Sequence, residues 1–304
     1  AWNAALSDCQ RAGDRVHVAD TRVCDHGAVD RFAVDRAMRG VADEIIRPRF
    51  RALGDDDVDS KSGPDDLVTI ADVEAERALD PLLRDVLDVP VVGEEATELD
   101  PSLPALLGSE PAAWTVDPVD GTWNFAHGSV EYAVMVAHVV DGDTAAGWIL
   151  HPETGDMLHG GGAGATVTGV DGAVRSVESV AGAAPRPLAQ LRGMAVLRFA
   201  PDEVADGLVT LAEDVSEITP PRMCAGWDYW DVLRGELDFL LYFRAKPWDH
   251  APGTAIVRAA GYAARHLDGA EYRPGDPGRP FLVARESEWD ALAAAIPARA
   301  GGVF

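Results

Sequence analysis

The segment Asp117-Pro118-Val119-Asp120-Gly121-Thr122 carries residue types suited to binding a metal ion and a phosphate. Two aspartates three positions apart, around a proline-bearing turn, can direct both carboxylates into one space, and Mg²⁺ prefers oxygen ligands. Gly121-Thr122 is the predicted start of a helix, where free backbone N–H groups can bind a phosphate. Taken alone, the segment fits an Asp-Pro turn with an aspartate cap equally well.

Other acidic positions could complete such a site. Glu94 and Glu95 follow the apolar run 89–92, which predicts a buried strand, although adjacent glutamates at a strand end are usually solvated. Asp249 stands just before the predicted helix 251–264. An aspartate there fits a helix cap as well as a ligand for a metal ion or a substrate hydroxyl.

Asp72 is the fourth candidate. It follows the strand-like run 67–71. It can cap the helix that comes next, or it can pair with a hydroxyl such as that of Thr122 to activate a water molecule.

Helix and strand signals surround these positions. In 29–51, Val34, Met38, Val41 and Ile45 recur at helical spacing. The first part of the chain mixes helices with mostly antiparallel strands and the second alternates strand and helix, which suggests two layered halves packed into one body. We expect further helices over 73–87, 204–215, 227–233 and 251–264, strands over 67–71, 89–92, 114–116, 132–140, 145–150, 157–159, 194–197 and 239–243, and loops over 54–64, 98–111 and 160–172.

Composition narrows the class of protein. The chain has 26 Lys and Arg against 51 Asp and Glu, a net charge of −25. Such a field repels nucleic acids and anionic membranes, so neither is an expected partner. It also repels a phosphorylated substrate, so a phosphate-handling enzyme of this charge needs bound cations. No apolar run approaches the roughly 20 residues of a membrane span, and the first residues lack a signal-peptide core, which predicts a cytoplasmic protein.

Four sequence blocks occur in a fixed order along the chain. They are Asp66-Leu67-Val68-Thr69 with Asp72, Gly93-Glu94-Glu95, Asp117-Pro118-Val119-Asp120-Gly121-Thr122-Trp123-Asn124-Phe125, and Trp248-Asp249 with Gly253. Together they resemble the inositol monophosphatase family, within the lithium-sensitive, Mg²⁺-dependent sugar-phosphatase superfamily. The resemblance covers roughly residues 29–280, and the third block is highly specific. The resemblance implies a layered α/β (α+β) sandwich with alternating helix and sheet layers, lithium sensitivity and a homodimer.

The resemblance also implies a role for each acidic residue, with two or three Mg²⁺ ions as cofactors. Glu94, Asp117 and the Val119 carbonyl would bind the first ion, and Asp117, Asp120 and Asp249 the second. Glu95 would reach a third ion through water.

The same resemblance implies the residues that handle water and phosphate. Thr122 and Asp72 would orient and help deprotonate the attacking water, and the amides of Gly121 and Thr122 would hold the phosphate. Two metal ions would then clamp an in-line displacement, without a phosphoenzyme.

The wall that faces the substrate departs from the family pattern. Inositol phosphatases carry a glutamate seven residues before the aspartate that matches Asp249, whereas this chain has Tyr242 there, followed by Arg244 and Lys246. Ala225 would line the same wall. The change puts inositol in doubt: the cations either favour a substrate with a second anionic group or balance nearby surface acids.

The expected function is Mg²⁺-dependent hydrolysis of a small phosphate monoester, of the inositol-1-phosphatase type. The alternatives are the same chemistry on histidinol phosphate, fructose 1,6-bisphosphate or a nucleotide 3′-phosphate, and a family member that acts as a binding or regulatory protein. We expect a tail over 1–28, an α+β half over 29–184 with most metal ligands, and an α/β half over 185–304 with Asp249 and the substrate wall.

Overall fold

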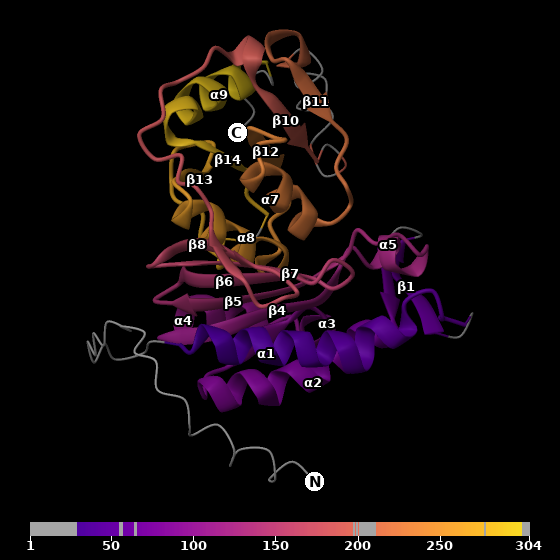
Figure 1. The fold of residues 1–304 in the computed structure, drawn as a ribbon. Coiled ribbons are helices and arrows are strands. Elements are labelled where there is room, and N and C mark those ends of the chain that lie inside the picture. Colours follow the sequence, from indigo (N-terminus) through magenta and orange to yellow (C-terminus); the bar gives the residue numbers. More distant parts are fainter. Residues whose placement is uncertain are drawn as a thin grey trace.

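In the computed structural model, helix and sheet layers alternate through the molecule (Figure 1). A pair of helices covers a large sheet, a second pair lies between it and a smaller sheet, and a last helix covers the smaller sheet. The layered sandwich that the resemblance implied is therefore confirmed. The structure describes residues 29–54, 57–63, 66–196, 198, 200, 211–276 and 278–299. The predicted tail 1–28 and most of the predicted helix 204–215 lie outside these residues.

The outer helical layer packs its apolar face against the large sheet. The predicted positions Val34, Met38 and Val41 are buried, but Ile45 is only partly buried and Ile46 is fully buried. A π-helical turn follows α1 and adds a residue to the turn, which rotates the buried face by one position. The segments of this layer are α1 (Arg31–Val41), η1 (Ala42–Ile46), η2 (Arg47–Arg49) and α2 (Ile70–Val86).

The large sheet has seven strands in the order β3-β4-β5-β6-β7-β8-β9. β3 and β4 are parallel, and every later neighbour is antiparallel. The parallel pair brings two carboxyl ends of strands to the same edge. The strands are β3 (Val91–Gly93), β4 (Ala112–Asp120), β5 (Ala133–Val140), β6 (Asp143–His151), β7 (Asp156–Gly161), β8 (Gly164–Thr168) and β9 (Val174–Ser176), and a separate hairpin pairs β1 (Val58–Gly63) with β2 (Asp66–Thr69).

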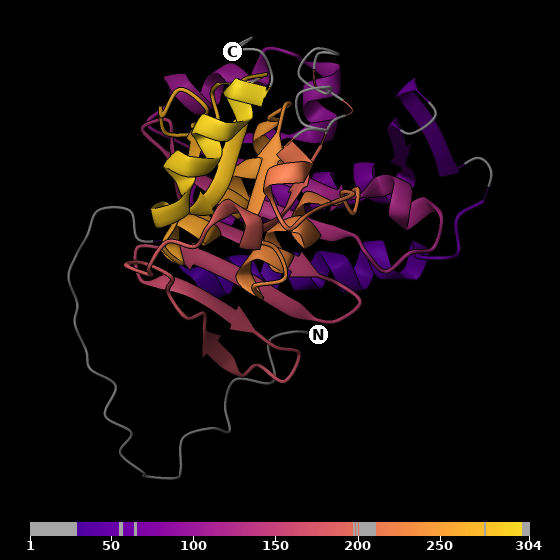
Figure 2. The same cartoon turned by 90° about the horizontal axis from the view of Figure 1, so that it is seen from above.

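The smaller sheet has five strands in the order β11-β10-β12-β14-β13. β10 is parallel to β11 and β12, and β14 is antiparallel to β12 and β13. Figure 2 shows this sheet and its covering helix above the large sheet. The elements are η5 (Leu188–Gln190), β10 (Arg192–Ala195), β11 (Glu217–Thr219), β12 (Phe239–Tyr242), β13 (Tyr262–His266), β14 (Phe281–Arg285) and α9 (Glu286–Arg299).

The two helices between the sheets are α7 (Ala225–Leu233) and α8 (Pro247–Ala259). α8 lies directly on the backbone of the large sheet, because two sheet positions carry no side chain. A Cβ added at Gly147 would lie 2.2 Å from Pro252 O, and one at Gly160 would lie 2.3 Å from Ile256 Cα. These glycines set how closely α8, which carries Asp249, approaches the sheet.

Several predicted loops contain regular structure. The region 54–64 contains β1, the region 160–172 contains the end of β7 and β8, and the region 98–111 contains short helices. The sequence did not predict these strands, because their polar and glycine residues have low β-propensity. Pairing with neighbouring strands stabilises them instead. The short elements are α3 (Glu94–Leu99), η4 (Leu103–Ala105), α4 (Leu106–Ser109) and α5 (Thr122–Ala126).

The helix predicted over 251–264 is displaced. It begins at Pro247, a residue suited to the first helical turn, and ends at Ala259. A turn at Ala260 and Gly261 follows, and the last predicted helical residues belong to β13. Lys246 is the N-cap, and Asp249 lies in the first turn. The cap role considered for Asp249 is therefore wrong.

Within the described residues, no helix is both long and apolar enough to cross a membrane.

We expect Gly160→Ala to lower the free energy of unfolding by about 3 kcal/mol, because overpacking against backbone atoms cannot relax by side-chain movement. The matched control is Gly162→Ala, where an added Cβ meets nothing within 4 Å. Urea unfolding followed by circular dichroism measures both. Equal midpoints for the two variants would show that the approach of α8 does not depend on this glycine.

Candidate active site

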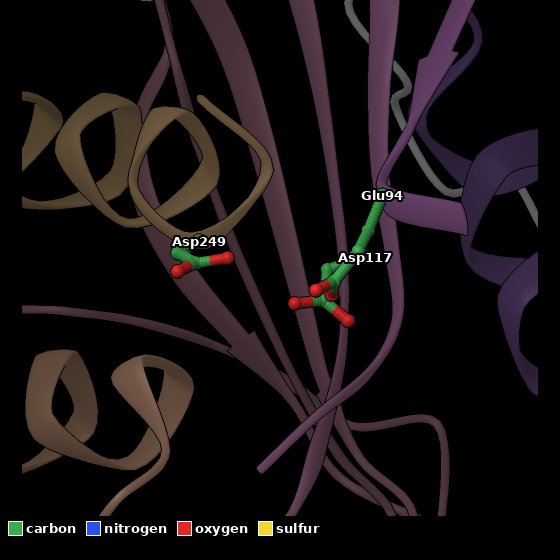
Figure 3. A group of neighbouring side chains, drawn as sticks. All are labelled: Glu94, Asp117 and Asp249. Carbon is green, nitrogen blue, oxygen red and sulfur yellow. The ribbon is translucent and has the colours of Figure 1, made fainter. Parts of the chain in front are cut away.

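Three predicted metal ligands meet at one cavity. One carboxylate oxygen from each of Glu94, Asp117 and Asp249 lies within 4.8 Å of the other two. Figure 3 shows the three side chains projecting from separate elements toward a common space. The cavity has a volume of about 480 Å³ and also reaches residues of α5, α7 and β12. The structure thus brings together residues more than 150 positions apart in the chain.

The parallel strands β3 and β4 place the first two carboxylates. Gly93, at the end of β3, pairs with Val116 of β4, so Glu94 and Asp117 leave the sheet side by side. Glu76 of α2 fixes the start of α3, since its carboxylate accepts the N–H groups of Glu95 at 2.8 Å and Ala96 at 2.7 Å.

Burial of these like charges close together destabilises the folded protein. Burial raises the pKa of Asp117 well above its usual range, and the neighbouring carboxylates of Glu94, Asp120 and Asp249 raise it further. Burial also raises the pKa of Asp249 to about 7. Asp117 is only 2% exposed, so water screens this repulsion little.

Two lysines offset part of the charge. Lys246 Nζ lies 2.9 Å and Lys61 Nζ 3.2 Å from the same oxygen of Glu94, and Lys61 Nζ lies 2.7 Å from Glu95 Oε1. Burial opposes ionisation of Glu94, but the two ammonium groups outweigh it and lower the pKa of Glu94. A cation that binds at Glu94 therefore competes with both ammonium groups.

The donor set fits a divalent cation such as Mg²⁺. All three converging atoms are carboxylate oxygens, which hard cations prefer. Asp117, the most buried of them, has no ion-pair partner among the described residues. A bound cation would offset the repulsion by neighbouring carboxylates, which adds to burial in raising the pKa of Asp117.

Asp120 lines the same cavity, but α7 holds one of its oxygens. Oδ2 accepts the N–H of Gly226 at 2.7 Å and the thiol of Cys224 at 3.0 Å. Asp120 is thus fixed at the start of α7, and although it lines the cavity it is not part of the three-oxygen cluster. Burial raises the pKa of Asp120 to about 6.

Thr122 and Asp72 form the second predicted pair, and the structure places them in contact. Thr122 Oγ1 lies 3.0 Å from Asp72 Oδ1 and 3.0 Å from the Val119 carbonyl oxygen. Asp72 Oδ2 accepts the backbone N–H of Thr69 at 2.8 Å, which completes a capping box at the start of α2. The two interpretations of Asp72, cap and hydroxyl partner, are therefore both realised, one by each oxygen.

Gly121 precedes Thr122 in a conformation that suits glycine. Its φ is 85°, and an added Cβ would lie 3.0 Å from Cys224 Cβ and 3.1 Å from Glu131 O. The tight turn lets β4 pass directly into α5, so that Gly121 and Thr122 both line the cavity.

Comparison with known proteins identifies the family to which this arrangement belongs. The profile of the Inositol monophosphatase family matches residues 28–301. The chain belongs to the inositol monophosphatase family.

Relatives share most of this length. The chain is 33% identical over 269 residues to the inositol-1-monophosphatase SuhB of Mycobacterium tuberculosis, covering 85% of this chain and 88% of that protein. It is 26% identical over 221 residues to a fructose-1,6-bisphosphatase/inositol-1-monophosphatase of Thermotoga maritima, covering 71% and 77%. The solved structure of a Thermotoga maritima IMPase has the same fold, with a TM-score of 0.70 at 22% identity, covering 90% of this chain and 98% of that one.

The substrate wall predicted from the departure in the family pattern lines the same cavity. Ala225, Tyr242, Arg244 and Lys246 all lie in its wall, whereas Glu95 does not. Tyr242 is 4% exposed and its hydroxyl donates to Asp228 Oδ2 at 3.1 Å.

Sequence reasoning missed several residues that shape the site. It did not assign roles to Glu76, Lys61 or Asp228. Glu76 lies four residues after Asp72 on α2, so helical spacing would have placed it on the same face. No sequence signal indicated that Lys61 and Lys246 share an oxygen of Glu94, because the three residues come from elements far apart in the chain.

We expect Asp117→Asn to stabilise the metal-free protein by about 1–3 kcal/mol at pH 8 and to abolish stabilisation by Mg²⁺. The folded-state pKa of Asp117 lies above its unfolded value, so ionisation lowers stability as the pH rises. The stabilisation by Asp117→Asn relative to the wild type should therefore become smaller as the pH falls toward about 4. Asparagine keeps the acceptor for Val119 N–H, which lies 3.0 Å from Asp117 Oδ1.

Thermal unfolding in EDTA and in Mg²⁺ measures this effect. The control is Asp85→Asn on the exposed face of α2. This substitution should leave the thermal midpoint unchanged in both EDTA and Mg²⁺. A variant that is still stabilised by Mg²⁺ as strongly as the wild type would contradict a role for Asp117 in metal binding.

Proposed function

We propose that this protein is a Mg²⁺-dependent phosphatase of small phosphate monoesters, of the inositol-1-phosphatase type. The observation that carries the proposal is the convergence of Glu94, Asp117 and Asp249 in one cavity, whose wall also contains Thr122. Thr122 is hydrogen-bonded to Asp72, which lies behind that wall. The 33% identity to an inositol-1-monophosphatase supports the inositol ester as first candidate.

The metal ligands proposed from the family are Glu94, Asp117 and the Val119 carbonyl for one ion and Asp117, Asp120 and Asp249 for another. When bound, Mg²⁺ supplies positive charge that lowers the pKa of a water and offsets charge developing on the phosphate oxygens. The proposed third ion, reached from Glu95 through water, competes with Lys61 for that carboxylate.

Thr122 and Asp72 are proposed to position and deprotonate the attacking water. A hydroxyl has one hydrogen, so Thr122 donates to Asp72 or to the Val119 carbonyl, and its lone pairs accept from the water. Burial raises the pKa of Asp72 to about 7, which suits a group that takes up a proton near neutral pH. Attack on phosphorus opposite the ester oxygen then releases the alcohol and inorganic phosphate.

The backbone N–H groups of Gly121 and Thr122 are proposed to hold the phosphate oxygens. The turn at Gly121 places both residues in the cavity wall, at the start of α5. Ala225 is proposed to contact the alcohol, since it begins α7 on the same wall.

A second candidate substrate carries another anionic group. Three basic residues, Arg198, Arg244 and Lys246, line the cavity beside its acidic residues and could bind a second anionic group. The Thermotoga relative named for fructose-1,6-bisphosphatase and inositol-1-monophosphatase activity supports the same candidate substrate.

Family membership supports two further proposals, lithium sensitivity and a homodimer. The complete acidic set argues against a member that only binds or regulates.

We expect Asp120→Asn to lower kcat/KM in Mg²⁺ by more than about 100-fold, since even the outer partners of metal ligands contribute 10–100-fold. Asparagine can still accept the Gly226 N–H, so the fold and the thermal midpoint should be retained. The measurement is phosphate release from inositol 1-phosphate, with Asp85→Asn as the control. Unchanged turnover would refute the assignment of Asp120 as a metal ligand.

A panel of esters separates the candidate substrates. Inositol 1-phosphate, histidinol phosphate, fructose 1,6-bisphosphate and a nucleoside 3′-phosphate are assayed with Mg²⁺, with and without Li⁺. We expect the highest kcat/KM on inositol 1-phosphate and inhibition by Li⁺. A preference for the bisphosphate that Arg244→Ala removes would instead establish the second candidate, and similar rates on all four would exclude any narrow assignment.

A further inference from the structure

We propose that the ammonium groups of Lys246 and Lys61 together act as a tethered substitute for a divalent cation. They compensate the charge of Glu94 in the metal-free protein and thereby set the affinity of the site for Mg²⁺. The inference rests on the metal site of the proposed function and concerns the groups that a metal ion must displace there.

Both ammonium groups meet at one carboxylate oxygen. Glu94 Oε1 lies 2.9 Å from Lys246 Nζ and 3.2 Å from Lys61 Nζ, and Lys61 Nζ also lies 2.7 Å from Glu95 Oε1. Glu94 is in turn one of the three residues whose carboxylate oxygens converge in the cavity. Two ammonium groups carry the same total charge as one Mg²⁺ ion, so the lysines place the charge of a divalent cation at a proposed metal ligand.

The ion pairs are shielded from water. The side chains of Lys61 and Glu94 are each 11% exposed, and that of Lys246 is 20% exposed. Burial opposes the charged form of Lys246, but the carboxylates of Asp249 and Glu94 outweigh it and raise the pKa of Lys246. The pKa of Lys61 is raised in the same way, by Glu94 and Glu95 against burial. Both lysines therefore stay charged, and water screens their attraction to Glu94 little.

Lys246 is an unfavourable residue for its position in α8. It is the N-cap, where Ser, Thr, Asp and Asn are preferred because their side chains accept backbone N–H groups, and its side chain makes no such bond. A cation at the start of a helix is also repelled by the helix dipole. Lysine thus weakens the start of α8, and its ion pair with Glu94 offsets that loss.

The tether has two effects of opposite sign. Because both ammonium groups belong to the chain, their concentration at Glu94 does not depend on the composition of the solution. They stabilise the protein when Mg²⁺ is absent. A Mg²⁺ ion that binds at Glu94 must instead displace or approach both of them, so the same lysines weaken its binding.

The test measures both effects without a substrate. Lys246→Met keeps the apolar stem and removes the charge, so it should lower the thermal midpoint in EDTA by about 5 °C, because Glu94 loses a buried partner. The same variant should bind Mg²⁺ about 10-fold more tightly in isothermal titration calorimetry, since a repulsive charge beside a proposed ligand is gone. Lys61→Met should show the same two changes, and the double variant should show both to a greater extent.

Arg36→Met is the matched control. It also removes one positive charge, but the Arg36 side chain is 69% exposed and its ion pair with Asp30 spans 3.7 Å. It should change neither the midpoint in EDTA nor the affinity for Mg²⁺. Equal losses of midpoint in EDTA and in saturating Mg²⁺ would show that the lysines have only a structural role. That result, or Mg²⁺ binding that is no tighter in the lysine variants, would overturn the proposal.

Phosphate release by the same proteins separates this inference from the proposed function. Tighter Mg²⁺ binding by the lysine variants of a protein that hydrolyses no ester would refute the proposed function and retain the inference. Equal Mg²⁺ affinities of wild type and variants, in a protein that hydrolyses esters, would overturn the inference and retain the proposed function. If none of the proteins bound Mg²⁺, both would be overturned.

Discussion

Repulsion among buried carboxylates is the constraint on which the arrangement of this protein depends. Glu94, Asp117 and Asp249 converge where burial raises the pKa of two of them. Lys61 and Lys246 at Glu94, and Lys246 and Arg244 near Asp249, offset part of the charge. Such a cluster lowers the stability of the fold that contains it. It persists because the surrounding elements hold each carboxylate in place, and it provides a strong electrostatic site for a divalent cation.

Those elements hold the cluster by close packing and by caps. Glycines in β6 and β7 let α8 lie against the backbone of the large sheet, and this contact fixes Asp249. The side chain of Glu76 caps α3 and fixes Glu94, while the start of α7 holds Asp120. Rigid secondary structure therefore carries the acidic residues, as expected for a site that must resist the mutual repulsion of its own carboxylates.

The layers were predictable from the sequence where hydrophobic periodicity is strong. α1, β5 and β12 follow the expected patterns closely, whereas α2 begins at Ile70, within the predicted strand 67–71. The failures have identifiable causes: a π-turn shifted the buried face from Ile45 to Ile46, and strand pairing ordered the polar residues of β1 and β8. α8 begins four residues early because Pro247 is suited to a first turn, a signal that the apolar pattern alone does not contain.

The sequence by itself determined which hard oxygen donors the chain carries and in what order. Their spacing and residue types alone fit capped turns as well as a metal site, whereas the resemblance of the four ordered blocks to the family implied a metal-dependent phosphatase. Only the tertiary structure decided which groups share the cavity. Lys61 and Lys246 reach one oxygen of Glu94, and Asp228 meets Tyr242, from elements that are distant in the chain. Such contacts depend on how α7 and α8 lie between the two sheets, a geometry set by packing rather than by local pattern.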